Sequence, residues 1–278
     1  MDRPISERLA ARRVSVDYGD RPVLAGLDVA FEAGTITTIV GPNGCGKSTL
    51  LRALGRLLAP RSGTVVLDGH DIARMRARDL ARRIGILPQG PVTPAGLTVA
   101  DLVGRGRYPH QSWLRQWSAD DEAVVRAVLD LTGMAEFADR PIDELSGGQR
   151  QRAWISLTLA QETGVLLLDE PTTYLDLSHA VEVLDLVDRL NVDLGRTVVM
   201  VLHDLNLAIR YSDRLVVLSD GAVVASGRPE QVITAELLRS VFRLAAQVVD
   251  DPVAPGLPLV VPHGRRRAAA RSSKVSVT

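Results

Sequence analysis

The apolar positions near the start of the chain alternate with polar ones, which is the period of a half-buried strand. Arg13–Tyr18 and Leu27–Phe31 follow this alternation, Pro22–Leu24 is short and apolar, and Val65–Leu67 forms a further short run. A Gly-Asp pair at 19–20 marks a turn between the first two segments. These segments predict a small antiparallel sheet.

Other runs lack the alternation and predict a second kind of sheet. Thr35–Val40, Val165–Leu168 and Thr197–Leu202 are apolar or β-branched throughout, as in parallel strands covered by helices on both faces. The first of them is followed by a glycine-rich turn and an apolar segment, Ser48–Leu58, that we expect to be a helix. Ser178–Leu194 has the broad apolar face of another helix. The pattern predicts an α/β fold with a parallel core sheet and an N-terminal antiparallel β-subdomain.

The stretch from about residue 90 to 162 lies between two of the parallel strands and is mostly helical in pattern. Within it, Ser118 and Asp121 have the spacing of a capping box at a helix start. We interpret this stretch as a helical subdomain inserted into one domain that spans residues 12–249. Residues 265–278 are rich in Arg, Ala and Ser without apolar periodicity, and we predict that this tail is disordered.

Composition excludes several classes of protein. The 278 residues include 33 basic and 33 acidic side chains, so a nucleic-acid partner, which usually requires a basic excess, is not expected. None of the apolar runs approaches the roughly 20 residues of a membrane-spanning helix. Cys45 is the single cysteine, so an intrachain disulfide is impossible and a reducing compartment is favoured. If the protein works at a membrane, it does so through a partner.

A glycine-rich stretch joins the first predicted parallel strand to its helix and carries the clearest chemical signal. It matches the phosphate-binding pattern G-x-x-x-x-G-K-[ST], in which glycines let backbone N–H groups surround phosphates. Lys47 then reaches the β- and γ-phosphates of ATP, and Ser48 binds Mg²⁺. An ordinary glycine-rich turn is the alternative, but the flanking strand and helix favour a nucleotide site. The expected ATP-binding residues are Gly41, Pro42, Asn43, Gly44, Cys45, Gly46, Lys47, Ser48 and Thr49.

Two carboxylates end the apolar run Val165–Leu168. Asp169 stands at the strand end, where it can hold Mg²⁺, and Glu170 follows, where it can orient or deprotonate the attacking water. A polar strand end that caps the next helix is the alternative interpretation. The phosphate-binding sequence upstream favours the catalytic one.

The sequence Leu-Ser-Gly-Gly-Gln at 145–149 opens an expected helix inside the inserted region. A serine hydroxyl, open backbone N–H groups and the helix dipole together favour a bound phosphate, whereas a flexible helix start is the alternative. The candidate residues are Ser146, Gly147, Gly148 and Gln149.

With this segment between the phosphate loop and the carboxylate-ending strand, the chain resembles the ATP-binding cassette (ABC) ATPases over residues 13–249. The resemblance implies further roles for four residues. Tyr18 matches the aromatic residue that stacks on adenine, and Asp176 matches the acidic residue of the D-loop. Gln89 matches the glutamine that contacts Mg²⁺ and water and senses the membrane partner, and His203 matches the switch histidine at the γ-phosphate.

In this family two cassettes work as a head-to-tail pair, and each ATP lies between the phosphate loop of one and the Ser-Gly-Gly-Gln of the other. The resemblance therefore implies a homodimer in which Ser146–Gln149 bind ATP in trans. It also implies an integral-membrane permease, an extracytoplasmic substrate-binding protein and a peripheral position on the cytoplasmic face of the cell membrane.

Three segments narrow the resemblance to the ATPases of ferric-siderophore importers, which are related to those of vitamin B12 and haem importers. They are Gly106–His110, Pro171–His179 and Gly227–Glu230. An exporter half-transporter would carry spanning segments, so it is disfavoured. Non-transport cassettes are further alternatives, but those acting on ribosomes usually carry two cassettes and those of DNA repair need a longer insertion. We therefore expect an ATPase that energises ferric-siderophore uptake.

Overall fold

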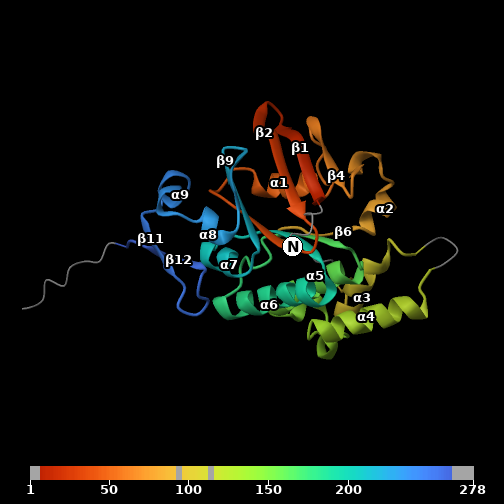
Figure 1. Cartoon of the computed structure of the whole chain (residues 1–278). Coiled ribbons are helices and arrows are strands. Elements are labelled where there is room, and N and C mark those ends of the chain that lie inside the picture. The colour runs from red at the N-terminus through yellow and green to blue at the C-terminus, as the bar shows by residue number, and fades with distance from the viewer. Residues whose placement is uncertain (1–6, 92–95, 112–115, 265–278) are drawn as a thin grey trace, which may run out of the picture.

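The computed structural model of the chain describes residues 7–91, 96–111 and 116–264 (Figure 1). A small sheet lies above a larger one, helices pack beneath the larger sheet, and a group of short C-terminal elements lies at one side. The tail at 265–278 falls outside the described residues, so its disorder stays a prediction.

The smaller sheet is antiparallel, with its strands in the order β2, β1, β4, β5. Strand β1 begins at Glu7, before the predicted segment. Arg13 has φ 47° and the pairing with β2 shifts there, so the alternation of apolar and polar residues changes phase within the strand. This change of phase hid the first part of the strand from the sequence pattern. A similar shift joins Pro22–Leu24 and Leu27–Phe31 into β2, with Gly26 N donating to Ser15 Oγ at 2.9 Å. The strands are β1 (Glu7–Tyr18), β2 (Arg21–Glu32), β4 (Ser62–Leu67) and β5 (His70–Asp71).

The larger sheet has the strand order β10, β9, β3, β8, β7, β6, and all its neighbours are parallel except β9 and β10. Strands β3, β7 and β8 are buried along their whole length, as continuous apolar runs predict. The predicted parallel core sheet is confirmed. Its strands are β3 (Ile36–Val40), β6 (Ile84–Leu87), β7 (Val165–Asp169), β8 (Thr197–Val201), β9 (Arg214–Ser219) and β10 (Ala222–Gly227).

Two helices cover opposite faces of the core sheet. Helix α1 (Lys47–Leu54) lies between the two sheets and packs its leucines against strands of both, while α6 (Leu177–Leu194) belongs to the apolar cluster on the other face. Gly55 ends α1, and a Cβ atom there would lie 2.4 Å from Ile86 Cδ1. The C-terminal end of the helix therefore packs tightly onto β6.

The segment between β6 and β7 forms a helical subdomain, as predicted. The capping box is present: Ser118 Oγ accepts from Asp121 N at 3.2 Å, and Asp121 Oδ2 accepts from Ser118 N at 3.1 Å. Asp121 also accepts from the buried Arg107 guanidinium at 2.9 Å, which ties two helical segments together. The elements are α3 (Val99–Gly104), η2 (Arg105–Arg107), α4 (Ala119–Leu131), η3 (Ala135–Phe137), η4 (Ile142–Glu144) and α5 (Gly147–Ala160).

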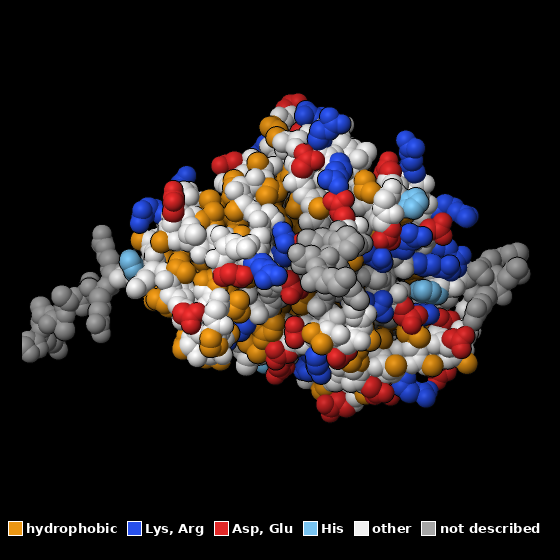
Figure 2. All heavy atoms as spheres, viewed as in Figure 1, with side chains coloured by type: hydrophobic (Ala, Val, Ile, Leu, Met, Phe, Trp, Pro, Cys, Tyr) orange, Lys and Arg blue, Asp and Glu red, His pale blue; other side chains and the backbone are white. Residues whose placement is uncertain are grey.

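Short helices before β6 carry a concentration of arginines. Figure 2 shows positive side chains gathered on the side of the molecule where α2 (Ala77–Ala81) lies, after η1 (Ile72–Arg74). Arg76 pairs with Asp79 at 3.2 Å, and Arg83 pairs with Asp68 at 3.7 Å. Acidic neighbours thus balance part of this charge, consistent with the neutral composition of the chain.

Regular structure continues beyond residue 249, where the predicted domain ends, as it does before residue 12 in β1. Asn206 fastens the C-terminal hairpin to α7, because its Nδ2 donates to Val260 O at 3.1 Å and its Oδ1 accepts from Val260 N at 2.9 Å. Within the described residues, no helix is long and apolar enough to cross a bilayer. The C-terminal elements are α7 (Leu205–Arg210), α8 (Pro229–Val232), α9 (Ala235–Ser240), β11 (Ala246–Asp250) and β12 (Pro258–Pro262).

Candidate active site

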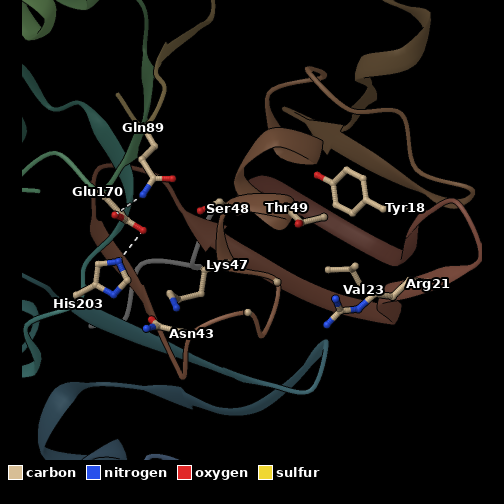
Figure 3. Close-up of a pocket in the computed structure, with 12 residues that line it drawn as sticks. Tyr18, Arg21, Val23, Asn43, Lys47, Ser48, Thr49, Gln89, Glu170 and His203 are labelled. Atoms are coloured by element: carbon tan, nitrogen blue, oxygen red, sulfur yellow. Dashed lines mark hydrogen bonds and ion pairs between the residues drawn. The ribbon is translucent and has the colours of Figure 1, made fainter. Parts of the chain in front are cut away.

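A cavity of about 570 Å³ opens at the carboxyl ends of the parallel strands, where the segments after β3, β6, β7 and β8 converge (Figure 3). This edge of a parallel sheet is the usual place for a ligand, and the volume is in the range of small-molecule pockets. Ten of the residues predicted from the sequence meet here. The lining residues are Tyr18, Arg21, Val23, Asn43, Gly44, Gly46, Lys47, Ser48, Thr49, Gln89, Glu170 and His203.

Two glycines give the loop after β3 its shape. Gly41 has φ 155°, and a Cβ atom there would lie 2.2 Å from Leu218 O. Gly46 has φ 106°, and a Cβ atom there would lie 2.7 Å from Leu24 Cδ2. A larger residue would displace the backbone or the core at either position. The loop therefore holds the N-terminus of α1, with its unpaired N–H groups and positive dipole end, at the cavity wall.

Lys47 places a buried positive charge in this loop. Its side chain donates from Nζ to Gly41 O and Pro42 O, both at 2.9 Å, and the residue is 5% exposed. No carboxylate of the described residues pairs with the ammonium group. A buried cation without a counter-charge is costly, so the cavity is electrostatically prepared for an anion.

Ser48 and Asp169 form an oxygen-rich corner beside the lysine. Ser48 Oγ donates to Asp169 Oδ1 at 2.8 Å, and Asp169 Oδ2 is buried without a hydrogen-bond partner among the described residues. Burial raises the pKa of Asp169 from its ordinary value, although the Ser48 hydrogen bond opposes the rise. An unpartnered carboxylate oxygen next to a hydroxyl is the kind of donor set that suits Mg²⁺, so these residues fit that cation.

The Glu170 carboxylate makes polar contacts with three side chains, two of which Figure 3 draws as dashed lines. Its Oε2 accepts from Gln89 Nε2 at 2.6 Å and from Thr173 Oγ1 at 2.8 Å, while Oε1 lies 2.6 Å from His203 Nε2. Burial alone would raise the pKa of Glu170, but the hydrogen bonds from Thr173 and His203 and the charge of His203 outweigh it and lower the pKa. The carboxylate is thus ionised at neutral pH and oriented on both sides.

Tyr18 lies at the other end of the cavity, at the end of β1, with 47% of its surface exposed. Arg21 and Val23 line the same end from the start of β2, and the sequence did not single them out. The available signal was the turn at 19–20, because a tight hairpin places Arg21 opposite Tyr18 in the register. Figure 3 shows these residues facing the Lys47 and Glu170 end across the pocket.

Three of the predicted loop residues shape the loop and do not line the cavity: Gly41, Pro42 and Cys45. Cys45 is 7% exposed, and a Cβ atom added at Gly41 would lie 2.9 Å from its Sγ. Burial raises the pKa of the Cys45 thiol, against the lowering effect of Lys47. The thiol is therefore neutral and packed, which makes it a poor nucleophile.

The segment Ser146–Gln149 and the side chain of Asp176 lie away from the cavity lining. Ser146 Oγ accepts from Gln149 N at 3.2 Å, and Gln149 Oε1 accepts from Ser146 N at 3.0 Å, so the pair caps α5. Ser146 and Gly147 are exposed. The loop after β3 and the start of α5 therefore lie on separate surfaces of one chain.

The sequence profile of the ABC transporter family matches residues 24–173, more than half of the chain. This range runs from β2 through the phosphate loop and the start of α5 to Thr173. The chain belongs to the ABC transporter family. The expected ATPase activity and the expected fold of the cassette are confirmed with it.

Relatives of this cassette align along nearly its whole length. The petrobactin import ATP-binding protein FpuD of Bacillus anthracis is 52% identical over 263 residues, which cover 95% of this chain and 96% of that protein. The ferric enterobactin transport ATP-binding protein FepC of Escherichia coli (strain K12) is 48% identical over 266 residues, covering 96% and 98%. The dimeric structure of MJ0796, a bacterial ABC transporter cassette, has a TM-score of 0.71 at 28% identity and covers 79% and 98%.

Proposed function

We propose that this cassette hydrolyses Mg-ATP as a homodimer beneath an integral-membrane permease and drives uptake of a ferric siderophore. The hydrolytic part rests on one arrangement, the Glu170 carboxylate held between Gln89 and His203 in a cavity that also contains the Lys47 ammonium group. The import part rests on identities of 52% and 48% to proteins named for petrobactin import and ferric enterobactin transport.

The cavity orients ATP from end to end. Tyr18 takes the adenine, and the loop at 41–49 takes the phosphates through its N–H groups and Lys47. Ser48 and Asp169, together with the amide oxygen of Gln89, would hold Mg²⁺, which would supply positive charge to neutralise the phosphate oxygens. The Asp169 Oδ2 atom, buried without a partner among the residues described, supports this assignment.

Glu170 acts on the attacking water. Its lowered pKa keeps it as a carboxylate, so it accepts the proton of the water or orients its lone pair toward the γ-phosphate. Thr173 and Gln89 donate hydrogen bonds to Oε2, and His203 orients the other oxygen, Oε1. His203 lines the cavity from the loop after β8, where its free ring nitrogen can contact the γ-phosphate.

Two chains complete each ATP site. The capped start of α5 exposes Ser146 and Gly147 away from the cavity of its own chain, so its N–H groups can meet a phosphate only on another molecule. In a head-to-tail homodimer, Ser146–Gln149 of each chain close over the ATP held by the partner. Asp176, the D-loop residue, stands at the start of α6 beside this surface. In the homodimer it lies at the same contact between the chains.

The cargo is chosen outside this chain. An extracytoplasmic substrate-binding protein delivers the ferric siderophore to the permease, and the cassette binds the permease from the cytoplasmic face. The segments Gly106–His110 and Pro171–His179 and the named cargoes of the relatives favour a siderophore, with vitamin B12 and haem as alternatives. Nucleic acid has no part in this scheme.

Uptake by a deletion strain tests the proposal. A strain without this gene and without redundant ATPases should fail to grow under iron limitation and to take up radiolabelled ferric siderophore. A plasmid copy of the wild type should restore uptake. The Glu170→Gln copy should not restore it, because this variant lacks the catalytic base although its fold is kept. Parallel uptake of labelled vitamin B12 and haem decides the cargo. Normal siderophore uptake in the deletion strain would refute the siderophore assignment and leave the ATPase assignment intact.

A further inference from the structure

His179, in the first turn of α6, touches two elements that are far apart in the sequence. Its Nδ1 atom lies 2.7 Å from Asp176 Oδ1, at the end of the loop that follows Glu170. Its ring also lies against the start of α5, where a Cβ atom added at Gly148 would be 2.7 Å from His179 Cδ2 and 3.1 Å from Cγ. Only glycine fits at 148 while the imidazole keeps this position.

The loop at 171–176 is fastened at both ends by side-chain hydrogen bonds. At its start, Thr173 Oγ1 donates to Glu170 Oε2 at 2.8 Å. At its end, Asp176 Oδ1 accepts from the backbone N of His179 at 2.9 Å and from Ser178 Oγ at 2.9 Å, besides the imidazole. The hydrogen bonds of His179 and Ser178 lower the pKa of Asp176 to about 2, so the carboxylate stays charged at all working pH values.

The start of α5 packs directly against the ring of His179. One turn farther along, Arg152 of α5 approaches Glu182 of α6 only at 4.0 Å. The loop itself is exposed at Tyr174, which has φ 67° and is 93% exposed. The imidazole is thus a close-packed link between the loop and the start of α5.

We propose that His179 is a positioning residue that couples the Ser146–Gln149 helix start to Glu170 of the same chain. This inference rests on the composite ATP site proposed above. Each chain gives its α5 start to one ATP site and its Glu170 to the other. A displacement of α5 when the partner's phosphate docks is passed through Gly148, His179 and the loop at 171–176. The two ATP sites are thereby linked inside each chain.

The imidazole makes two contacts that substitutions can separate. His179→Phe keeps a ring against Gly148 but has no donor for Asp176. His179→Asn keeps a donor near the position of Nδ1 but removes most of the ring. Ser178→Ala is the matched control, because it also removes one hydrogen bond to Asp176 Oδ1 without changing the contact with Gly148.

The test uses purified full-length protein and compares ATP binding with steady-state turnover over a range of ATP concentrations. His179→Ala and His179→Phe should bind ATP with the wild-type Kd and keep the wild-type melting temperature. Their kcat should fall about 5- to 150-fold, the usual range of a coupling between sites, with loss of any sigmoidal ATP dependence. His179→Asn should recover part of kcat, and Ser178→Ala should remain near wild type.

Ser146→Arg separates failure of this inference from failure of the composite site. Its bulk should abolish turnover if phosphate docks on the start of α5. If Ser146→Arg is inactive while His179→Ala and His179→Phe turn over at the wild-type rate, the coupling role of His179 is wrong. If Ser146→Arg itself is fully active, the composite site is wrong and the coupling role falls with it. If the His179 variants show weaker ATP binding and a lower melting temperature together with the lower kcat, His179 is a merely structural residue.

Discussion

Tyr18 is the one aromatic side chain that lines the described part of the cavity, and it stands where the adenine of ATP is expected. Base–aromatic stacking contributes about 1–3 kcal/mol, so Tyr18→Ala should raise the Kd for ATP about 5- to 150-fold. Tyr18→Phe should bind like the wild type, because the ring is kept. Tyr108, which is 62% exposed and lies outside the cavity, provides the control Tyr108→Ala. Equilibrium binding of a fluorescent ATP analogue measures all three, and an unchanged Kd in Tyr18→Ala would remove the adenine from this position.

The proposed role of Asp169 in metal binding should lower the stability of the nucleotide-free protein. Its pKa is raised by burial, so the charged form is disfavoured in the fold, and this penalty is present at neutral pH and disappears as the pH falls below the raised pKa. Asp169→Asn should therefore stabilise the nucleotide-free protein at neutral pH by about 0.5–2 kcal/mol. The gain should shrink in acid, where the wild-type carboxyl is also neutral.

Thermal unfolding with and without Mg-ATP measures this exchange. Asp169→Asn should lose the extra stabilisation that Mg²⁺ gives to ATP-bound wild type, and its Mg-dependent turnover should collapse. Asp213→Asn is the comparison, because Asp213 Oδ2 already accepts from Ile36 N at 2.8 Å and its replacement removes a satisfied hydrogen bond. A lower melting temperature for nucleotide-free Asp169→Asn would contradict the argument.

The candidate site was predictable where its residues follow one another in the sequence. The loop at 41–49 and the pair Asp169 and Glu170 carry their signal in local order, because a strand, a turn and a helix suffice to place them. The hydrogen bonds of Glu170 with Gln89 and His203 join segments after three different strands, and only the resemblance to the family pointed to them. The contact between His179 and Gly148 has no local signal, since it depends on how two helices pack.

At the scale of elements, Arg107 holds the helical subdomain together through a buried ion pair. It donates to Asp121 Oδ1 at 2.9 Å and to Glu162 Oε2 at 2.7 Å, and the Arg107 and Asp121 side chains are 6% and 7% exposed. Removing one partner strands a buried charge, so Arg107→Met should destabilise the protein by about 3–5 kcal/mol. The double variant with Asp121→Leu should recover a large part of this loss, because neither charge remains.

Urea unfolding of the two single variants and the double variant forms the cycle. Arg126→Met is the matched control, because Arg126 pairs with Glu122 at the same 2.9 Å but on an exposed face, where ion pairs contribute about 0–1 kcal/mol. The pKa of Asp121 is lowered by Arg107 and Ser118 against the effect of burial, so this stabilisation is present at neutral pH and is lost in acid. If the losses of unfolding free energy in the two single variants add up to the loss in the double variant, the ion pair contributes nothing beyond its separate side chains.

The elements that the sequence predicted are those whose environment is uniform along their length. Strands β3, β7 and β8 are buried on both faces, and α6 has one continuous apolar face, so each has a single period. Strand β1 was predicted too short because the bulge near Arg13 interrupts its period. The hairpin β11–β12 was missed because its short strands show no clear alternation and are held by contacts with α7, such as the amide of Asn206.

At the scale of the whole molecule, the proposed homodimer accounts for two candidate surfaces that one chain keeps apart. Lys47 and Glu170 meet in one cavity, while the exposed start of α5 at Ser146 belongs to another surface of the same chain. In the proposed two-fold homodimer, each surface would meet the other chain and form two equivalent composite sites. Inactivating variants on the two surfaces should therefore complement each other in trans.

Mixing Lys47→Ala with Ser146→Arg tests this directly. In a heterodimer of the two, one site has both defects, but the other combines an intact phosphate loop with an intact α5 start. Each variant alone should be inactive, whereas an equimolar mixture should recover about a quarter of the wild-type rate if composite sites work independently, because half of the dimers are mixed and each has one good site. The coupling through His179 should lower the recovery below a quarter, because the good site uses Glu170 of the chain whose α5 start is blocked. No recovery at all, with mixed dimers demonstrated by affinity tags, would mean that both sites must be intact for turnover. Full activity of Ser146→Arg alone would instead show that one chain holds a complete site.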